Sequence, residues 1–147
     1  MSNLKDDFKT FTDKALLLEI VDVEKHIKSF TVRSVFLLAE IDRRRLWVEQ
    51  GFLSIYDYAQ RRLGLSPDVA YRRVTAIKFL EKFPKSVEKF KNLELSLTSI
   101  VQIMQAIARQ ENKGRIVNNE EGNKLIEDCS GKTKNETGEV WISSKES

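Results

Sequence analysis

Histidine and cysteine are nearly missing from this chain of 147 residues, which has one of each, His26 and Cys129. A single Cys cannot form an internal disulfide, and one His with one Cys cannot supply the four ligands of a usual zinc site. A Ser–His–acid triad would need His26 as its base, yet that residue lies within a helical apolar pattern, where a structural or solvated role is expected. These shortages favour a protein that is not an enzyme and that binds neither a cofactor nor a metal ion.

Long apolar runs and helix-breaking residues are also scarce. No stretch approaches the roughly 18 apolar residues needed to span a membrane. Lys5, Asp6 and Asp7 stand where a signal peptide would need apolar residues. We therefore expect a cytoplasmic protein without a membrane partner. Only 2 Pro and 6 Gly occur, and they fall where helices would end.

The residues that are abundant follow a helical period. Hydrophobic residues make up 41% of the chain and charged residues 32%, which is typical of a globular protein. Thr12 can cap a helix over residues 13–29, in which Leu16, Ile20, Val23 and Ile27 recur at helical spacing. A second helix is predicted over residues 31–50 and should be the central, buried one, with Gly51 at its C-terminal end.

Residues 54–82 have the layout of a helical hairpin. Ser54 is placed to cap a short helix that includes Ala59, a small residue that allows close helix packing. Gly64 can adopt the left-handed conformation that ends this helix. Ser66 can cap the next helix, and Pro67 suits its first position. Phe83 and Pro84 should end that helix, because a residue before proline resists helical angles.

Further helices are predicted after this hairpin: a short one after Ser86, one from Ser96, and a last one over residues 119–129. The fold class that follows is all-α, a compact helical bundle with an embedded helix-turn-helix-like hairpin. The domain prediction is one helical domain over residues 1–131 and a polar tail over residues 132–147. In the tail only Val140–Trp141–Ile142 is apolar.

Charge is concentrated in the middle of the chain. Residues 43–91 carry 12 Lys and Arg against 5 Asp and Glu, whereas the flanking segments are both slightly acidic. A basic centre is expected if one surface meets phosphate groups. It is equally compatible with a helical protein that solvates its faces with Lys and Arg.

The hairpin and the basic segment together predict double-stranded DNA as the partner. The second helix of a helix-turn-helix presents its outer face to DNA, and its start can also lie against a phosphate. Arg73 departs from the pattern of phage repressors, which have Ile or Val there. The candidate DNA-binding residues lie on this helix and at the preceding arginine run: Arg43, Arg44, Arg45, Ser66, Asp68, Tyr71, Arg72, Thr75, Lys78 and Lys82.

Several ordered blocks resemble the N-terminal helical domain of a group of bacterial HNH endonucleases. They are Ile41–Leu46, Gly51–Tyr58, Leu63–Ser66, Ala70–Arg73, Phe83–Pro84, Leu93–Thr98 and Cys129–Lys134, within residues 13–136. A weaker likeness, over residues 63–104, is to the helix-turn-helix of ParB-type partitioning proteins. The resemblance implies a domain that precedes an HNH nuclease module and is thought to help engage DNA. The histidines that such a nuclease needs are missing here.

Three hypotheses stay open at the level of sequence. The first is a small non-catalytic DNA-binding protein that is regulatory or competes with a nuclease for its sites. The second is a protein-interaction module that binds a partner nuclease or forms a homodimer, with residues 31–50 as the seam. The third is a remnant of a nuclease whose catalytic part lies elsewhere.

Overall fold

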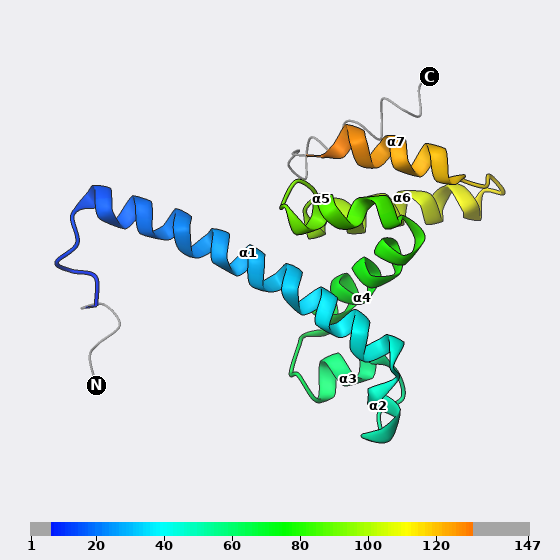
Figure 1. The fold of residues 1–147 in the computed structure, drawn as a ribbon, viewed down its shortest axis with the longest axis horizontal. Helices are drawn as coiled ribbons and strands as arrows, with labels where there is room; N and C mark the ends of the chain where they lie inside the picture. Colours follow the sequence, from blue (N-terminus) through cyan, green and yellow to red (C-terminus); the bar gives the residue numbers. More distant parts are fainter. Residues whose placement is uncertain (1–6, 131–147) are drawn as a thin grey trace.

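The computed structural model describes residues 7–130, and every regular element within that range is helical (Figure 1). The all-α fold class is therefore confirmed. The elements in chain order are α1 (Asp13–Arg43), α2 (Leu46–Glu49), α3 (Ile55–Arg61), α4 (Pro67–Lys82), the 3-10 turn η1 (Pro84–Ser86), α5 (Val87–Lys91), α6 (Leu97–Asn112) and α7 (Asn119–Cys129). The predicted tail over residues 132–147, with Val140–Trp141–Ile142, lies outside the described residues.

One helix, α1, replaces the two long helices predicted over residues 13–29 and 31–50. The Thr12 cap is confirmed, since its hydroxyl accepts from the Ala15 amide at 3.1 Å. No break occurs near residue 30, where the hydroxyls of Ser29 and Thr31 donate to the carbonyls of Lys25 and Ile27, each four residues earlier. These bonds satisfy the polar side chains within a continuous helix, so the predicted boundary was wrong.

The predicted end of the second helix was also wrong. The α1 helix ends at Arg43, and Arg45 then adopts a left-handed conformation with φ of 52°. The corner is fixed by Trp47, whose indole Nε1 donates to the Asp42 carboxylate at 3.0 Å. Gly51 does have the expected positive φ of 84°, but it follows the short α2 rather than a long helix.

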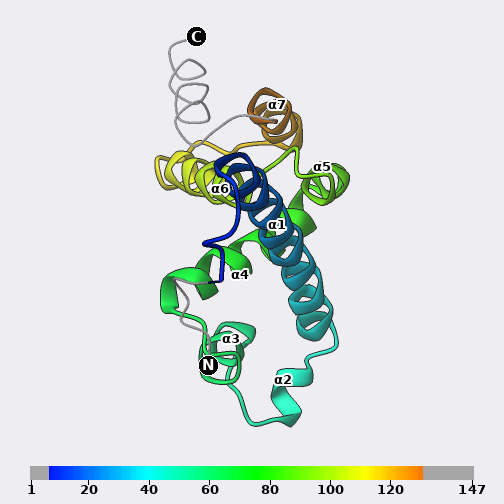
Figure 2. The ribbon, with the colours of Figure 1, turned by 90° about the vertical axis from the view of Figure 1, so that its left-hand side faces the viewer.

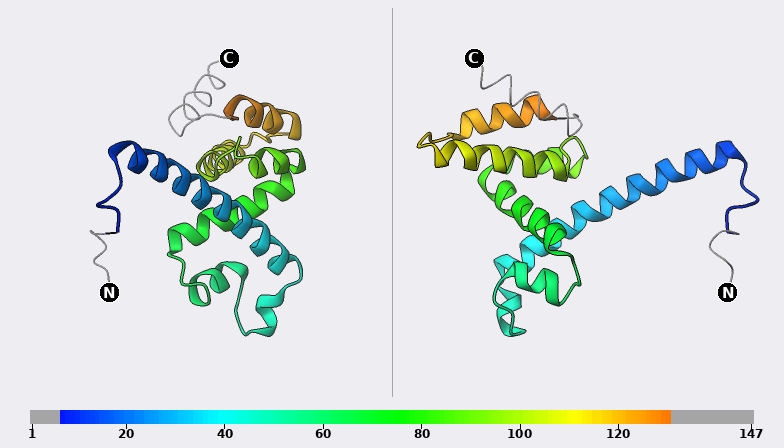
Figure 3. Two further views of the ribbon diagram at one scale, coloured as in Figure 1. Left: turned by 60° about the vertical axis from the view of Figure 1, so that its left-hand side comes forward. Right: turned by 180° about the vertical axis from the view of Figure 1, so that it is seen from behind.

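The N-terminal half of α1 does not join the bundle. Figures 1 and 3 show this part of the helix extending away from all other elements. Leu16, Ile20, Val23 and Ile27 are 39–53% exposed, although their spacing had suggested a core-facing stripe. The prediction of one compact bundle therefore fails for residues 13–30. The periodicity identified a helix correctly, but it could not show what that helix packs against.

Helix α4 is the centre of the bundle. It packs against α1, α3 and α6, and α1 crosses it at an angle (Figure 2). Within α1, Val35 and Leu38 are buried at this crossing region. Arg73 contributes there as well, because its guanidinium Nη1 donates to the Ser34 hydroxyl at 2.8 Å. The residue that departs from the repressor pattern thus links α4 to α1.

The second half of the bundle is formed by α5, α6 and α7. Ser96 caps α6 by accepting from the Ser99 amide at 3.0 Å, as expected. Helix α7 has the predicted bounds and lies beside α6 (Figure 1). The core continues through this half with a set of buried apolar residues: Phe79, Phe83, Phe90, Leu95, Ile100, Ile103, Ile107 and Ile126.

Candidate nucleic-acid interface

The α3–α4 hairpin has the local structure that the sequence predicts. The Ser54 hydroxyl accepts from the Asp57 amide at 2.9 Å, and the Ser66 hydroxyl accepts from the Val69 amide at 3.2 Å. Gly64 has a φ of 71°, which ends the first helix, and Pro67 is the first residue of α4. Ala59 is fully buried where α3 packs against α4. These caps leave the start of α4 at the surface.

Four of the ten predicted contact residues lie at the N-cap and in the first two turns of α4. Ser66, Asp68, Tyr71 and Arg72 are all exposed. The Arg72 guanidinium donates to the Asp68 carboxylate at 2.7 Å, one turn earlier on the same helix. Both side chains are exposed, and surface pairs of this kind contribute only about 0.3–0.5 kcal/mol. Arg72 can therefore exchange Asp68 for a ligand at little cost.

Two of the residues predicted on the outer face of α4 are not free at the surface. Thr75 is only 8% exposed, because α6 packs over this part of α4, and its assignment as an outward residue was wrong. Lys82 is half-buried, and its Nζ lies 3.4 Å from the Glu111 carboxylate of α6. Helix α4 is buried on more sides than a two-helix hairpin alone would suggest.

A shallow groove runs between α4 and α6. Its lining residues come from both helices: Tyr71, Thr75, Lys78, Met104, Gln105, Ala108 and Arg109. Lys78 is exposed on α4 and Arg109 is exposed on α6, and within residues 7–130 neither has an ion-pair partner. Two cations without an ion pair in the described chain thus line a groove that also includes Tyr71, in the second turn of α4.

The α6 side of this groove was missed in the sequence. Gln105 and Arg109 are four residues apart and lie on the exposed face of α6, opposite the buried Ile103 and Ile107. The only signal was their place on the polar side of an amphipathic helix, which is the usual position of any solvated residue. Their relevance depends on the packing of α6 across α4, and that packing is not local information.

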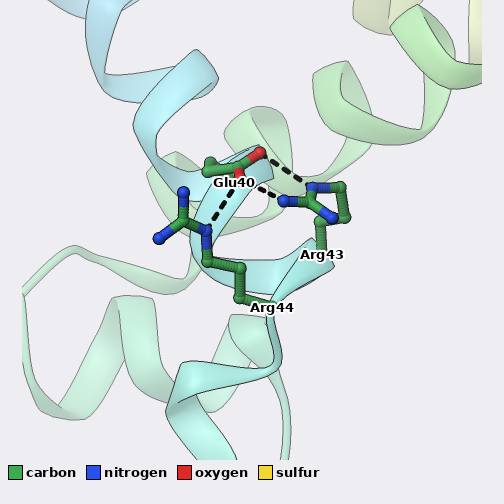
Figure 4. A network of polar contacts seen from close by, with 3 residues as sticks. All are labelled: Glu40, Arg43 and Arg44. Atoms are coloured by element: carbon green, nitrogen blue, oxygen red, sulfur yellow. Dashed lines mark hydrogen bonds and ion pairs between the residues drawn. The ribbon is translucent and has the colours of Figure 1, made fainter.

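Two of the three arginines at the C-terminal end of α1 are paired with a carboxylate. Arg43 and Arg44 both donate to the Glu40 carboxylate, at 2.5 and 2.8 Å (Figure 4). The hydrogen bonds from Arg43 and then Arg44 lower the pKa of Glu40 from 4.5 to about 2. Arg45 makes a different contact, with its guanidinium carbon 5.3 Å from the centre of the Trp47 ring. All three arginines are exposed, as expected for residues that leave the core.

Over residues 7–130, no group of three or more His, Cys, Asp or Glu side chains could hold a metal ion. His26 is exposed on α1, where its Nδ1 donates to the Asp22 carbonyl at 2.8 Å. Cys129 is buried at the end of α7.

The helices of the described residues are amphipathic or short. None of them combines the length and the apolar character needed to cross a bilayer.

Comparisons of the chain with known family models, with curated proteins and with solved structures found no match.

Proposed function

We propose that this protein binds duplex DNA through the exposed start of α4 and the groove between α4 and α6, without catalysing a reaction on it. The observation that carries the proposal is the juxtaposition of Lys78 and Arg109, two exposed cations without an ion-pair partner in the described chain, beside a capped and exposed helix start. Unpaired cations are the groups that gain most from phosphate contact, because each displaces a condensed counterion.

The exposed groups divide into two roles. Lys78 and Arg109 flank the groove and would contact phosphate oxygens, which position a protein without reading sequence. Tyr71 and Arg72 lie in the second turn of α4 and would reach base edges in the major groove. Lys82 is held by Glu111, so it belongs to the packing of α4 against α6 rather than to the DNA contact.

The resemblance to the N-terminal domain of HNH endonucleases supports this proposal, because that domain is thought to engage DNA. The basic segment over residues 43–91 supports it as well. The non-catalytic part of the proposal rests on His26, the single histidine, which is exposed on α1 away from the groove.

The deciding experiment reverses the charge of Arg72 and Lys78 together and measures duplex binding by fluorescence anisotropy over a series of salt concentrations. A matched variant reverses Lys25 and Lys124, two exposed lysines that do not line the groove, and changes the net charge equally. We expect the first variant to lose binding and the second to keep most of it. Equal binding by the wild type and the folded Arg72→Glu, Lys78→Glu variant at low salt would contradict the proposal and favour a protein-binding bundle.

Single substitutions then separate the two roles. Lys78→Ala should weaken all duplexes alike and lower the slope of log K against log salt by about one. Arg72→Ala should make the free energy of DNA binding less favourable by roughly 1–3 kcal/mol and relax the preference at one base pair.

Lys82→Ala should change the thermal stability more than the DNA affinity, because its partner is Glu111.

A further inference from the structure

The projecting half of α1, residues 13–30, and the turn before it form an apolar arm. Figures 1 and 3 show that no other element of the described chain lies against most of its length. Between residues 8 and 30, ten large apolar side chains are 39–68% exposed: Phe8, Phe11, Leu16, Leu17, Leu18, Ile20, Val21, Val23, Ile27 and Phe30. A solvated helix of a monomer would carry polar residues at most of these positions.

One side of the arm is apolar along its whole length. Seven of the ten share this side of the arm and are 39–68% exposed: Leu16, Leu17, Ile20, Val21, Val23, Ile27 and Phe30. Apolar residues on the surface of a typical monomer are instead scattered or form only small patches. A standard protein interface buries about 800 Å² on each partner. The apolar side of the arm therefore supplies a large share of what one partner of such an interface buries.

The pattern of the arm fits another helix. Leu16, Ile20, Val23, Ile27 and Phe30 alternate at spacings of four and three residues, which is the spacing of the apolar seam in a two-helix coiled coil. The seam is about 20 Å long at the rise of an α-helix, so the partner must be helical over a comparable length. A second copy of this chain supplies such a helix.

We propose that the arm pairs in antiparallel orientation with the arm of a second copy. Charge selects this orientation, because Glu19 and Glu24 flank the seam and would face each other in a parallel pair. In the antiparallel pair, Glu19 of each copy lies opposite the partner's Arg33. Within residues 7–130, neither Glu19 nor Arg33 has an ion-pair partner in its own chain.

A groove at the base of the arm supports the same orientation. It measures about 230 Å³ and lies between α1, at Ile27, Thr31 and Val32, and the apolar residues Phe90, Leu93 and Leu95 around α5. Antiparallel pairing centred near residue 25 brings the N-terminal half of the second arm to this level.

Two apolar residues outside the seam match this groove. Leu17 and Val21 lie on the flank of the arm that continues into Lys28 and Thr31, which line the groove. In the antiparallel pair, the partner's Leu17 and the partner's Val21 face this groove, and each copy fills the groove of the other. In a parallel pair, Leu17 and Val21 would stay exposed to solvent. Only the antiparallel pair therefore accounts for two apolar residues at these positions.

The oligomeric state of the full chain tests the proposal, by sedimentation equilibrium at increasing protein concentration. We expect the mass to rise from 17.0 kDa to twice that value. Ile20→Lys or Val23→Lys should raise the dissociation constant of the dimer by about tenfold or more, since each places a charge in the apolar seam. Ser29→Lys is the matched control, because it adds the same charge on the outer side of the arm. These positions are exposed in one copy, so circular dichroism should show unchanged folding.

Charge exchange tests the orientation. Glu19→Arg should weaken the dimer, Arg33→Glu should weaken it also, and the double variant should restore it. A parallel pair would instead be strengthened by Glu19→Arg, which would then face Glu24. The proposal is overturned by a wild type that stays monomeric at high micromolar concentration, or by a dimer that neither Ile20→Lys nor Val23→Lys weakens. A monomer that binds vesicles of anionic phospholipid through the arm would overturn it in favour of a membrane surface.

Discussion

Glu40 controls how much of the positive charge at the end of α1 is available to a ligand. Because Arg43 and Arg44 share its carboxylate, two cations are partly neutralised by one anion. We expect Glu40→Gln to strengthen binding to all duplexes alike and to steepen the salt dependence, provided that this corner lies near the phosphate backbone. The control is Glu49→Gln, which removes an exposed carboxylate that makes no ion pair in the described chain. Unchanged affinity for both variants would place the arginine run outside the DNA interface.

The same contact predicts the titration of Glu40. Its pKa is about 2 in the folded protein, against 4.5 for an unperturbed glutamate. The stabilisation from the ion pairs is therefore fully present above pH 4.5, and it is lost as the pH falls toward 2. Carbon-detected NMR of the side-chain carboxyl should give a midpoint near 2, and Arg43→Gln should move it upward. A midpoint near 4.5 in the wild type would show that the network does not persist in solution.

At the level of single residues, the sequence predicted caps well and outward residues less well. Thr12, Ser54 and Ser66 act as predicted, because a capping bond joins atoms only three residues apart. The prediction that Thr75 points outward failed, because the residue is buried by α6, which is more than 20 residues away in the chain. The α4 residues of the candidate site were thus partly predictable, whereas Arg109 and Gln105 were not.

The position of α7 depends on one small residue. A Cβ atom at Gly122 would overlap ring carbons of Phe83, a fully packed core side chain. We expect Gly122→Ala to lower the free energy of unfolding by about 1–3 kcal/mol, because overpacking outweighs the roughly 1 kcal/mol gain in helix propensity. Lys124→Ala, at an exposed position of the same helix, is the control.

Hydrogen exchange would locate the effect of Gly122→Ala. Amides of α7 should lose protection first, while those of α4 keep theirs, since α7 packs at the edge of the bundle. Uniform loss of protection across all helices would show instead that α7 unfolds only together with the rest.

At the level of elements, helix type was predictable and helix continuity was not. The apolar period identified helical residues on both sides of residue 30, but it gave no reason for the chain to stay straight there. Conversely, α1 ends at Arg43 without a glycine, and Arg45 takes a left-handed conformation that arginine adopts rarely. The Trp47–Asp42 hydrogen bond stabilises that corner, but it joins two side chains across the turn and has no recognised sequence motif, unlike a Ser cap or a Gly end.

At the scale of the whole molecule, α1 contains two valines in opposite environments. Val35 is completely buried against the bundle, and Val23 is 39% exposed on the arm. Val35→Ala should lower the free energy of unfolding by about 1–3 kcal/mol at every protein concentration, because it leaves a cavity. Val23→Ala should have an effect only at concentrations where the arms pair. Equal effects of the two substitutions in dilute solution would mean that the arm packs on its own chain.

Helix α1 is unbroken from the arm to its crossing with α4 (Figure 2). The direction in which the apolar side of the arm points is therefore fixed relative to the proposed DNA-binding surface on α4. One residue inserted after Phe30 would turn the arm by about 100° against the bundle, and seven residues would return it to within about 20°. If both proposals hold, the helix sets the rotational offset between two binding faces. A one-residue insertion should then abolish joint binding of two sites on one duplex, yet leave single-site affinity intact. The number of residues between the arm and the bundle would then determine which spacings of two sites along the duplex a dimer can bind.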